Sequence, residues 1–177
     1  MATSLLVLSD THLPTRAKAL PEELWSGIEA ADMVVHAGDW VNEALLDELQ
    51  ARSRRLLACY GNNDGAGLRA RLPLVATAVV EEVRLAVVHE TGPAAKRGER
   101  MDLQFPDTDL LIFGHSHIPW DSVAPSGMRL LNPGSPTDRR RQPFCTYLWV
   151  EIDGSAVTPD LRRLPPRETG RRARPSA

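Results

Sequence analysis

The sequence predicts an α/β protein, and three observations support this. Short apolar runs alternate with helix-like segments through the first half of the chain, a pattern typical of a largely parallel sheet with helices packed on it. The second half is richer in strand-like segments. A length of 177 residues, with 42% apolar and 25% charged residues, suits one soluble domain with a substantial core.

The first half supplies three strands and two helices in alternation. Residues 5–9, 33–35 and 56–60 are apolar runs with the length of buried strands. A helix is expected from Pro21 to about residue 30, because proline and the two glutamates after it favour a first helical turn. A second helix is expected over residues 42–50, where three leucines and an alanine form one apolar face.

The second half is expected to be mostly β. Strands are predicted at residues 75–80, 84–88, 110–113, 118–123, 128–131 and 144–152, with turns at 81–83 and 125–127. Residues 94–104 are expected to be irregular or helical. We expect one domain over residues 1–161 and a mobile tail over residues 162–177, which is rich in Arg and Pro and almost devoid of apolar residues.

Polar residues follow five of the predicted strands at the point where each strand ends. These strand exits read Asp10-Thr11-His12, Gly38-Asp39, Gly61-Asn62-Asn63-Asp64, His89-Glu90 and Gly114-His115-Ser116-His117. In an extended segment, residues two apart point the same way, so the paired ligands of one exit are expected to converge. In open α/β sheets the ligand crevice lies outside the carboxyl ends of the strands.

All five histidines of the chain lie in or beside these exits, at His12, His36, His89, His115 and His117. One histidine alone is weak evidence of a metal site, whereas the whole set is not explained by scattered core or surface positions. Two carboxylates, one amide and four imidazoles, without thiolate, suit Mn²⁺, Fe²⁺, Co²⁺ or Zn²⁺. Seven ligands exceed the needs of one catalytic ion and suit two ions about 3.5–4 Å apart with one bridging carboxylate.

In this order, the motifs Asp-x-His, Gly-Asp, Gly-Asn-x-Asp, His and Gly-His-x-His resemble the calcineurin-like metallophosphoesterase superfamily. The short chain, the HAGD at 36–39 and the NPGS at 132–135 most resemble its small YfcE-type phosphodiesterase branch, a relative of the retromer vacuolar-sorting subunit. The resemblance covers roughly residues 4–153. It implies two packed mixed β-sheets flanked by helices, and a metal-dependent phosphoesterase, most readily a phosphodiesterase.

The resemblance also implies a division of the metal ligands. The first ion would take Asp10, His12, Asp39 and His117, and the second would take Asp39, Asn62, His89 and His115. Asp39 would bridge the two ions, and a hydroxide held between them would attack phosphorus. Mn²⁺ is the expected metal, with Fe, Co, Ni or Zn as alternatives. Asp39, Asn62 and His36 are the candidate catalytic residues.

Several residues beside the ligands have open roles. Asn63 stands where larger relatives carry a histidine, and an amide cannot give up a proton to a leaving group. Glu90 replaces a glycine usual in the family, and it either affects the site or points to solvent. His36 is interpreted as a hydrogen-bonding partner of the ligands, and Asp64 as a residue that fixes Asn62 or a ligand histidine. Residues 132–135 are interpreted as a structural loop, and residues 139–141 as a solvated surface or a phosphate contact.

The net charge and the composition of the chain limit which partners and which cellular location are expected. The formal net charge of −2 and the lack of a DNA-binding extension make nucleic acid an unexpected partner, and a small phosphate ester is the expected substrate. No apolar stretch is long enough to span a bilayer, and residues 1–9 lack the features of a secretory signal, so a cytoplasmic protein is expected. A protein-binding scaffold of the same fold and a nuclease are the alternative functions. The oligomeric state is left open.

Overall fold

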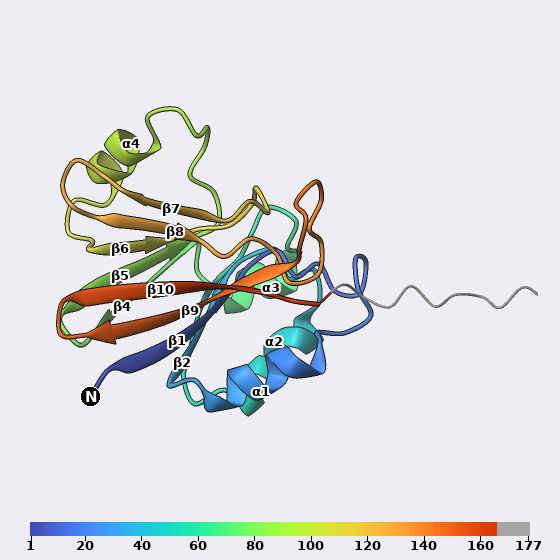
Figure 1. The fold of residues 1–177 in the computed structure, drawn as a ribbon. Helices are drawn as coiled ribbons and strands as arrows, with labels where there is room; N and C mark the ends of the chain where they lie inside the picture. Colours follow the sequence, from blue (N-terminus) through green and yellow to red (C-terminus); the bar gives the residue numbers. More distant parts are fainter. Residues whose placement is uncertain (166–177) are drawn as a thin grey trace, which may run out of the picture.

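A computed structural model describes residues 1–165 and shows two mixed five-stranded sheets packed against each other (Figure 1). In spatial order the first sheet contains β10 (Ala156–Arg163), β9 (Thr146–Asp153), β1 (Thr3–Leu8), β2 (Met33–Ala37) and β3 (Leu56–Cys59). The strands β1, β2 and β3 are parallel, while β9 runs antiparallel to both β1 and β10. The parallel part therefore has the alternating strand and helix order that the first half predicts.

The second sheet contains β4 (Val75–Val80), β5 (Val83–Val88), β6 (Leu110–Ile112), β8 (Arg129–Asn132) and β7 (Trp120–Val123). Its three central strands, β5, β6 and β8, are parallel, and an antiparallel strand closes each edge. Residues 81 and 82 form the turn between β4 and β5, as the sequence predicts.

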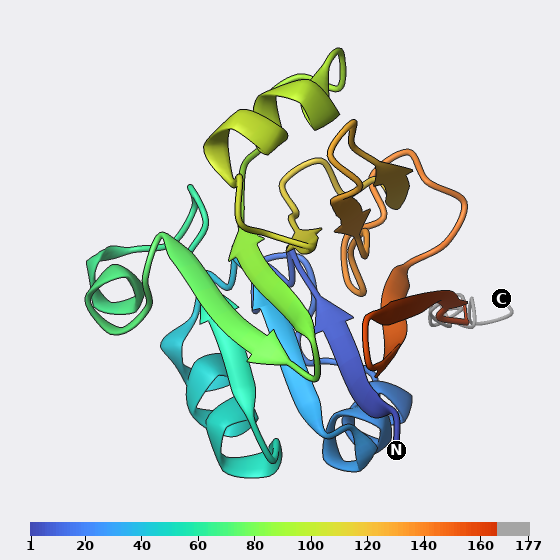
Figure 2. The same ribbon diagram turned by 90° about the vertical axis from the view of Figure 1, so that its left-hand side faces the viewer.

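Within the described part of the chain, four helices lie outside the two sheets, namely α1 (Glu22–Ala30), α2 (Glu43–Arg52), α3 (Ala66–Arg71) and α4 (Arg97–Gln104). Figures 1 and 2 show α1 and α2 on one side of the molecule and α4 on the opposite side. The side chain of Asn42 caps α2 by accepting a hydrogen bond of 2.7 Å from the Ala44 amide, which explains where this helix begins. No helix within residues 1–165 is long and apolar enough to cross a membrane.

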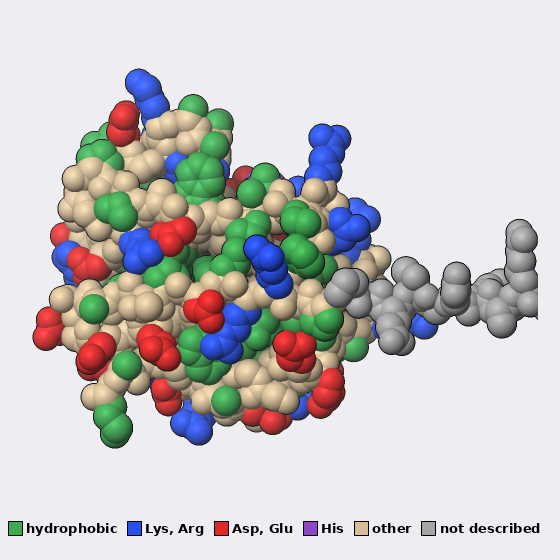
Figure 3. Space-filling view, in the orientation of Figure 1, with side chains coloured by type: hydrophobic (Ala, Val, Ile, Leu, Met, Phe, Trp, Pro, Cys, Tyr) green, Lys and Arg blue, Asp and Glu red, His purple; other side chains and the backbone are tan. Residues whose placement is uncertain are grey.

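The two packed sheets divide the apolar core into three layers, one on the outer face of each sheet and one between the sheets. Along β1, Leu6 and Leu8 pack with the helices, whereas Leu5 and Val7 face the second sheet. A third cluster, which includes Met101 of α4, covers the outer face of the second sheet. Full burial of each such side chain stabilises the fold by about 1.5–3 kcal/mol. On the face shown in Figure 3, acidic and basic side chains are interspersed.

The predicted fold class is confirmed, and the segment at 94–104 contains the helix α4. The sequence prediction missed α3 and β10. It was wrong to end the folded part at residue 161, because β10 continues to Arg163 and Leu164 is buried. The strand β10 lies at the edge of its sheet, and its sequence is mostly exposed and partly charged. The edge position also explains why this strand tolerates Pro159. The rest of the expected tail, residues 166–177, lies outside the described residues.

Candidate metal centre

Three buried side chains meet beyond the ends of β1 and β6. The nearest oxygen of Asp10, Oδ1, lies 3.4 Å from Nε2 of His117 and 3.9 Å from Nε2 of His12. The two histidine Nε2 atoms lie 3.2 Å apart. All three residues are buried, so their donor atoms face one another in a site largely closed to water.

A second group of donors adjoins the first. Asp39 Oδ2 lies 3.3 Å from Nε2 of His89 and 3.5 Å from Nε2 of His12. Asn62 Oδ1 lies 3.1 Å from Nε2 of His89 and 2.9 Å from Nδ1 of His115. The structure therefore brings together all seven residues that the sequence selected as ligands.

The unsatisfied polar atoms of the site fit a bound cation. Asp10 Oδ1 is buried and accepts no hydrogen bond, although an unpaired buried carboxylate oxygen is costly. Two sets of donors within the described residues have the spacing of a metal site, Asp10 with His12 and His117, and Asp10 with Asp39 and His89. Ligand atoms bonded to one ion at about 2.0–2.2 Å lie roughly 3–3.5 Å from each other, close to the separations seen here.

The ligand side chains converge because of their backbone conformations. The sequence instead predicts side chains that alternate along extended segments. Five of the candidate ligands adopt left-handed backbone conformations, with φ of 57° at Asp10, 45° at His12, 60° at Asp39, 70° at His115 and 58° at His117. Non-glycine residues rarely adopt this region, and such strain clusters at functional sites. The expectation of extended segments with alternating side chains was therefore wrong, because these residues lie in tight turns after the strands.

Glycines make room for these turns. A Cβ atom on Gly114 would collide with Ser9 Oγ and lie 2.8 Å from Asp10 Oδ2, and one on Gly61 would collide with Asp39. Gly38 has a φ of 90°, and its Cβ would lie 2.8 Å from Nδ1 of His89. The glycine that precedes each of three exit motifs is thus required by close packing against the ligands.

Backbone carbonyls fix the orientation of two ligand rings. The Nδ1–H of His117 donates to the carbonyl oxygen of Asp138 at 2.6 Å, and that of His89 donates to the carbonyl oxygen of Ala37 at 2.7 Å. A carbonyl only accepts, so each ring carries its proton on Nδ1. The lone pair of Nε2 is then free for a metal ion, which is the usual arrangement of metal-bound histidine.

Burial and neighbouring charges shift the pKa values of the donors. Burial raises the pKa of Asp10 to about 7, and it lowers the pKa of His12 and that of His117, the latter to about 4. Burial opposes ionisation of Asp39 too, but hydrogen bonds from His89 and Asn63 outweigh it and lower the pKa of this carboxyl. At neutral pH the site thus favours neutral His12 and His117 and an ionised Asp39. Burial also lowers the pKa of His89, but hydrogen bonding to Asp39 and the charges of Asp10 and Asp39 outweigh it and raise this pKa.

His36 supports the ligand loops from beneath. It is fully buried and stacks on Trp40 with ring centroids 3.6 Å apart. The amide of Gly38 donates to its Nδ1 at 3.2 Å, so Nε2 carries the proton and donates to the hydroxyl of Thr11 at 3.1 Å. Its hydrogen bonds therefore reach the neighbours of Asp10 and Asp39, as expected for a residue that orients ligands.

Asp64 binds the backbone of the Asp39 loop, and its expected contact with Asn62 or a ligand histidine was wrong. Its carboxylate accepts hydrogen bonds from the amides of Asp39 at 3.0 Å, Trp40 at 2.8 Å, Val41 at 2.7 Å and Gly61 at 2.7 Å. A buried carboxylate satisfies four amides here, and it joins the exits of β2 and β3.

Asn63 faces Asp39. Its amide N–H donates to Asp39 Oδ1 at 2.9 Å, and its side-chain Nδ2 donates to Asp39 Oδ2 at 2.6 Å. Both carboxylate oxygens are therefore held by one residue. The sequence identified Asn63 only as a missing proton donor, and this orienting contact was not foreseen.

The loop at 132–135 binds the backbone of two ligand loops, in agreement with the structural interpretation. Ser135 Oγ donates to the carbonyl of Asp10 at 2.8 Å, and Asn132 Nδ2 donates to that of Gly114 at 2.9 Å. Two further residues were missed by sequence reasoning: Thr137, which donates to the carbonyl of Thr11 at 2.6 Å, and Asp138, which orients His117. Their proximity to the NPGS motif was the available signal.

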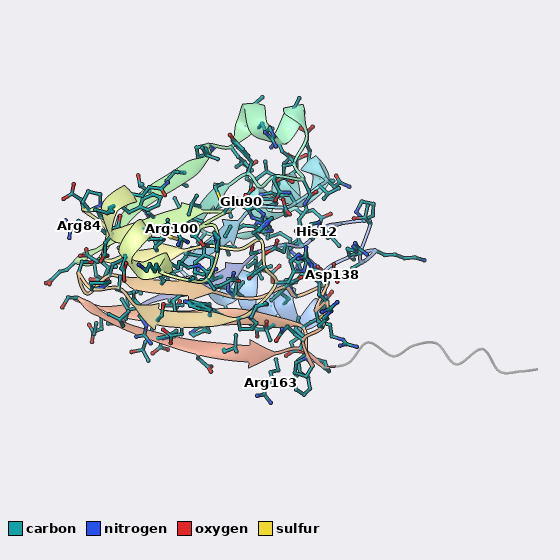
Figure 4. All side chains as sticks on the ribbon, turned by 90° about the horizontal axis from the view of Figure 1, so that it is seen from above. His12, Arg84, Glu90, Arg100, Asp138 and Arg163 are labelled. Atoms are coloured by element: carbon teal, nitrogen blue, oxygen red, sulfur yellow. The ribbon has the colours of Figure 1, made fainter. Side chains whose placement is uncertain are left out.

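The remaining residues with open roles are exposed. Glu90 lies in solvent beside the centre, and residues 139–141 are exposed as well. Figure 4 shows His12 and Asp138 towards one end of the molecule, Glu90 nearer to its middle and Arg84 at the other end. The centre is thus confined to one end, where the strand exits meet.

Comparison with known proteins agrees with this fold and donor set. The chain belongs to the calcineurin-like phosphoesterase superfamily, whose domain model matches residues 4–155. A probable metallophosphoesterase of Methanothermobacter thermautotrophicus is 30% identical over 162 residues, which cover 89% of this chain and 90% of that protein. A phosphodiesterase of Methanocaldococcus jannaschii is 25% identical over 124 residues, covering 63% and 71%. The expected enzyme class, a metallophosphoesterase, is confirmed by these relatives.

Solved structures show the same fold. A Thermotoga maritima protein solved by NMR has a TM-score of 0.74 and 30% identity, covering 92% of this chain and 99% of that one. Wild-type Vps29 of Entamoeba histolytica, crystallised with zinc, has a TM-score of 0.74 and 21% identity, covering 92% and 98%. The second likeness concerns the fold alone.

Proposed function

We propose that the protein hydrolyses phosphodiesters with two divalent metal ions, of which Mn²⁺ is the first choice. The observation that carries the proposal is the convergence of five buried donors, those of Asp10, His12, Asp39, His89 and His117, which include the unpartnered Oδ1 of Asp10, with Asn62 and His115 adjoining them. Bound ions would supply Lewis-acid charge for the attack of a water on phosphorus. The relative named a phosphodiesterase supports the choice of a diester.

The contacts support the division of ligands that the resemblance implies. Asp10, His12 and His117 would hold the first ion, and Asn62, His89 and His115 would hold the second. Asp39 Oδ2 lies within 3.5 Å of a nitrogen from each set, His12 and His89. This position suits a carboxylate that binds both ions and offsets their mutual repulsion.

The residues near the reacting group orient ligands and offer no evident acid. Asn63 holds both oxygens of Asp39, and the proton on His36 Nε2 is directed at Thr11. A departing alcohol would therefore leave without a proton from either residue. Diesters with acidic leaving groups, such as nitrophenyl diesters, should be cleaved far better than alkyl diesters, since general acid help is worth about 10²–10⁴-fold.

One assay tests the function. Purified protein is stripped with a chelator and reloaded with Mn²⁺, Fe²⁺, Co²⁺, Ni²⁺ or Zn²⁺ in turn. It is then screened against phosphomonoesters, phosphodiesters and cyclic nucleotides. We expect metal-dependent cleavage of diesters that Asp10→Asn lowers by more than about 100-fold and Asp109→Asn leaves intact, since Asp109 pairs with Arg84 far from the centre.

A protein-binding scaffold is the competing function, because the fold is shared with Vps29. A scaffold needs no complete donor set, so it predicts no hydrolysis with any metal and no difference between Asp10→Asn and Asp109→Asn. That outcome would overturn the proposed hydrolase.

A further inference from the structure

An open pocket of about 480 Å³ lies next to the metal centre and has no role so far. Asn62 and His89, two of the proposed ligands, form part of its lining. Glu90, another lining residue, directly follows His89 in the chain. A group bound in this pocket would therefore touch residues that hold an ion.

One part of the lining is a Tyr60–Arg69 pair held in a fixed position. The guanidinium of Arg69 lies 4.9 Å from the centroid of the Tyr60 ring. Arg69 Nε donates to the carbonyl of Asp64 at 2.7 Å, and its terminal nitrogen donates to that of Asn62 at 3.1 Å. The pair is thus fastened to the loop that carries Asn62, and it offers a flat surface at a set distance from the centre.

The apolar part of the lining comes from Leu74, Val75 and Val88. Leu74 is 57% exposed, although its side chain is entirely apolar. An exposed apolar side chain beside a pocket is a natural contact for the carbon skeleton of a ligand. The pocket therefore suits a group with a substantial apolar body.

Two exposed residues, Glu90 and Gln104, add polar groups to the lining. A carboxylate accepts hydrogen bonds, and an amide both donates and accepts them. The carboxylate of Glu90 also disfavours a second anionic group in the pocket. Glu90 and Arg69 carry opposite charges, so these two residues give the lining no net charge, and it suits an uncharged group with hydrogen-bond donors.

The geometry of displacement at phosphorus determines which of the two ester groups of a diester would occupy the pocket. The attacking water lies at the donor cluster, and the leaving oxygen departs on the opposite side of phosphorus. The groups that stay bonded to phosphorus lie on the flanks of the line that joins the attacking and the leaving oxygen. We place the pocket on such a flank because its lining includes Asn62 and His89, which belong to the donor cluster itself.

We propose that this pocket binds the alcohol that stays on phosphorus, and that this alcohol is an uncharged, ring-containing group such as a nucleoside. The inference rests on the proposed diester hydrolysis. Glu90, Leu74 and Gln104 then determine specificity, while the donor cluster performs the chemistry.

Two diesters with the same leaving group test the pocket. Thymidine 5′-(4-nitrophenyl) phosphate and methyl 4-nitrophenyl phosphate carry equal charge and release the same nitrophenolate. We expect kcat/KM to be about tenfold or more higher for the thymidine ester, the lower end of what pockets deliver for added apolar groups. Equal values for the two esters would overturn the proposal.

Two leucine variants test whether the preference for the thymidine ester arises in this pocket. Leu74→Ala removes part of the lining, whereas Leu103→Ala removes an 85% exposed leucine that does not line the pocket. Leu74→Ala should lower the ratio of kcat/KM for the thymidine ester to that for the methyl ester, and Leu103→Ala should leave this ratio as it is. Equal behaviour of the two variants would contradict the assignment.

Charge discrimination tests Glu90. A 3′-phosphate on the thymidine ester adds negative charge within the pocket, and we expect it to lower kcat/KM in the unaltered protein. Glu90→Gln should relieve part of that loss, so that the ratio of kcat/KM for the plain ester to that for the phosphorylated ester becomes smaller. If Glu90→Gln affects both esters equally, this residue does not select against a second anion.

A binding experiment separates failure of the pocket from failure of the proposed function. Metal-loaded, ¹⁵N-labelled protein is titrated with thymidine 5′-(methyl phosphate), which lacks an activated leaving group. Shifts at Val75 and Val88 with none at Leu103 would support the pocket even if neither nitrophenyl ester is cleaved. Absence of shifts at Val75 and Val88 would overturn the pocket, while cleavage of the methyl ester would still support the hydrolase.

Discussion

The two halves of the candidate metal centre differ in burial. In the first half, Asp10, His12 and His117 are at most 8% exposed. In the second half, His89 is equally buried, but Asn62 and His115 are exposed. The same centre is therefore closed on one side and open to solvent on the other.

The difference indicates a division of labour. The closed half is held by many internal contacts, including those of Ser135 and Asp138, so its donors are positioned before any ion arrives. The open half adjoins the pocket beside Glu90 and is where a substrate can approach. We expect the closed half to bind its ion more tightly, and the open half to govern access of the ester.

The largest expected effect concerns the carboxylate between the halves. Asp39→Asn should lower kcat/KM more than Asp10→Asn, because Asp39 Oδ2 lies near donors of both halves. Each should lose more than about 100-fold, the upper range for residues that merely support a ligand. Kinetics combined with elemental analysis of bound metal checks this. Equal losses at equal metal content would remove the support for a bridging Asp39.

A histidine pair measures the difference between the halves directly. His117→Ala should weaken the tighter ion by more than about 100-fold, while His115→Ala should stay within about tenfold for that ion. Calorimetric titration of the metal-free variants with Mn²⁺ gives both affinities. If His115→Ala proves as harmful to the tighter ion, burial does not set the order of affinity.

The loop between the halves depends on Asp64. Asp64→Asn places N–H donors opposite backbone amides, and we expect a loss of about 1–3 kcal/mol in the free energy of unfolding. Activity should fall about 10–100-fold through the displaced Asp39 loop. Urea unfolding and kcat/KM are the measurements. The control is Asp47→Asn, an exposed partner of Arg71, for which about 0.5 kcal/mol or less is expected.

The smallest expected effect is a pH-dependent gain in stability. Since the pKa of Asp10 is raised to about 7, the folded metal-free protein keeps a proton that the unfolded chain loses near pH 4. Stability therefore falls as pH rises from about 4 to 7 through this residue. Metal-free Asp10→Asn should be about 1–2 kcal/mol more stable than the unaltered protein at pH 8, with a smaller gain at pH 5. Urea unfolding at both pH values checks this, and a pH-independent difference would argue against the shift.

Much of the candidate centre follows from the sequence because ligand chemistry resides in side-chain identity. Acidic, amide and histidine residues at successive strand exits were sufficient to select all seven donors. The turns that aim them were not predictable in this way, because left-handed backbone at Asp10 or His115 leaves no signature in residue type. The same holds for the carbonyl of Asp138, since every residue has one.

The fold shows the same division. Strands buried on both faces, such as β1 and β2, form continuous apolar runs and were found from the sequence. The edge strand β10 has one paired neighbour and few buried side chains, so its sequence reads as loop. The helix α3 has six residues, too few for a helical period to appear.

The origin of the donors has a consequence for motion. Asp10, His12, Asp39 and Asn62 follow strands of the first sheet, whereas His89, His115 and His117 follow strands of the second. Ions bound by both sets would add a further link between two layers that are otherwise joined by apolar packing and a few hydrogen bonds, such as those from His89 to the Ala37 carbonyl and from Arg129 to the Val157 carbonyl. The two sheets would then separate less often at the end that holds the ions than at the opposite end, where the turns at 81–82 and 154–155 lie. In hydrogen exchange, metal loading would slow the amides after β1, β2, β5 and β6, and leave those two turns as fast as before.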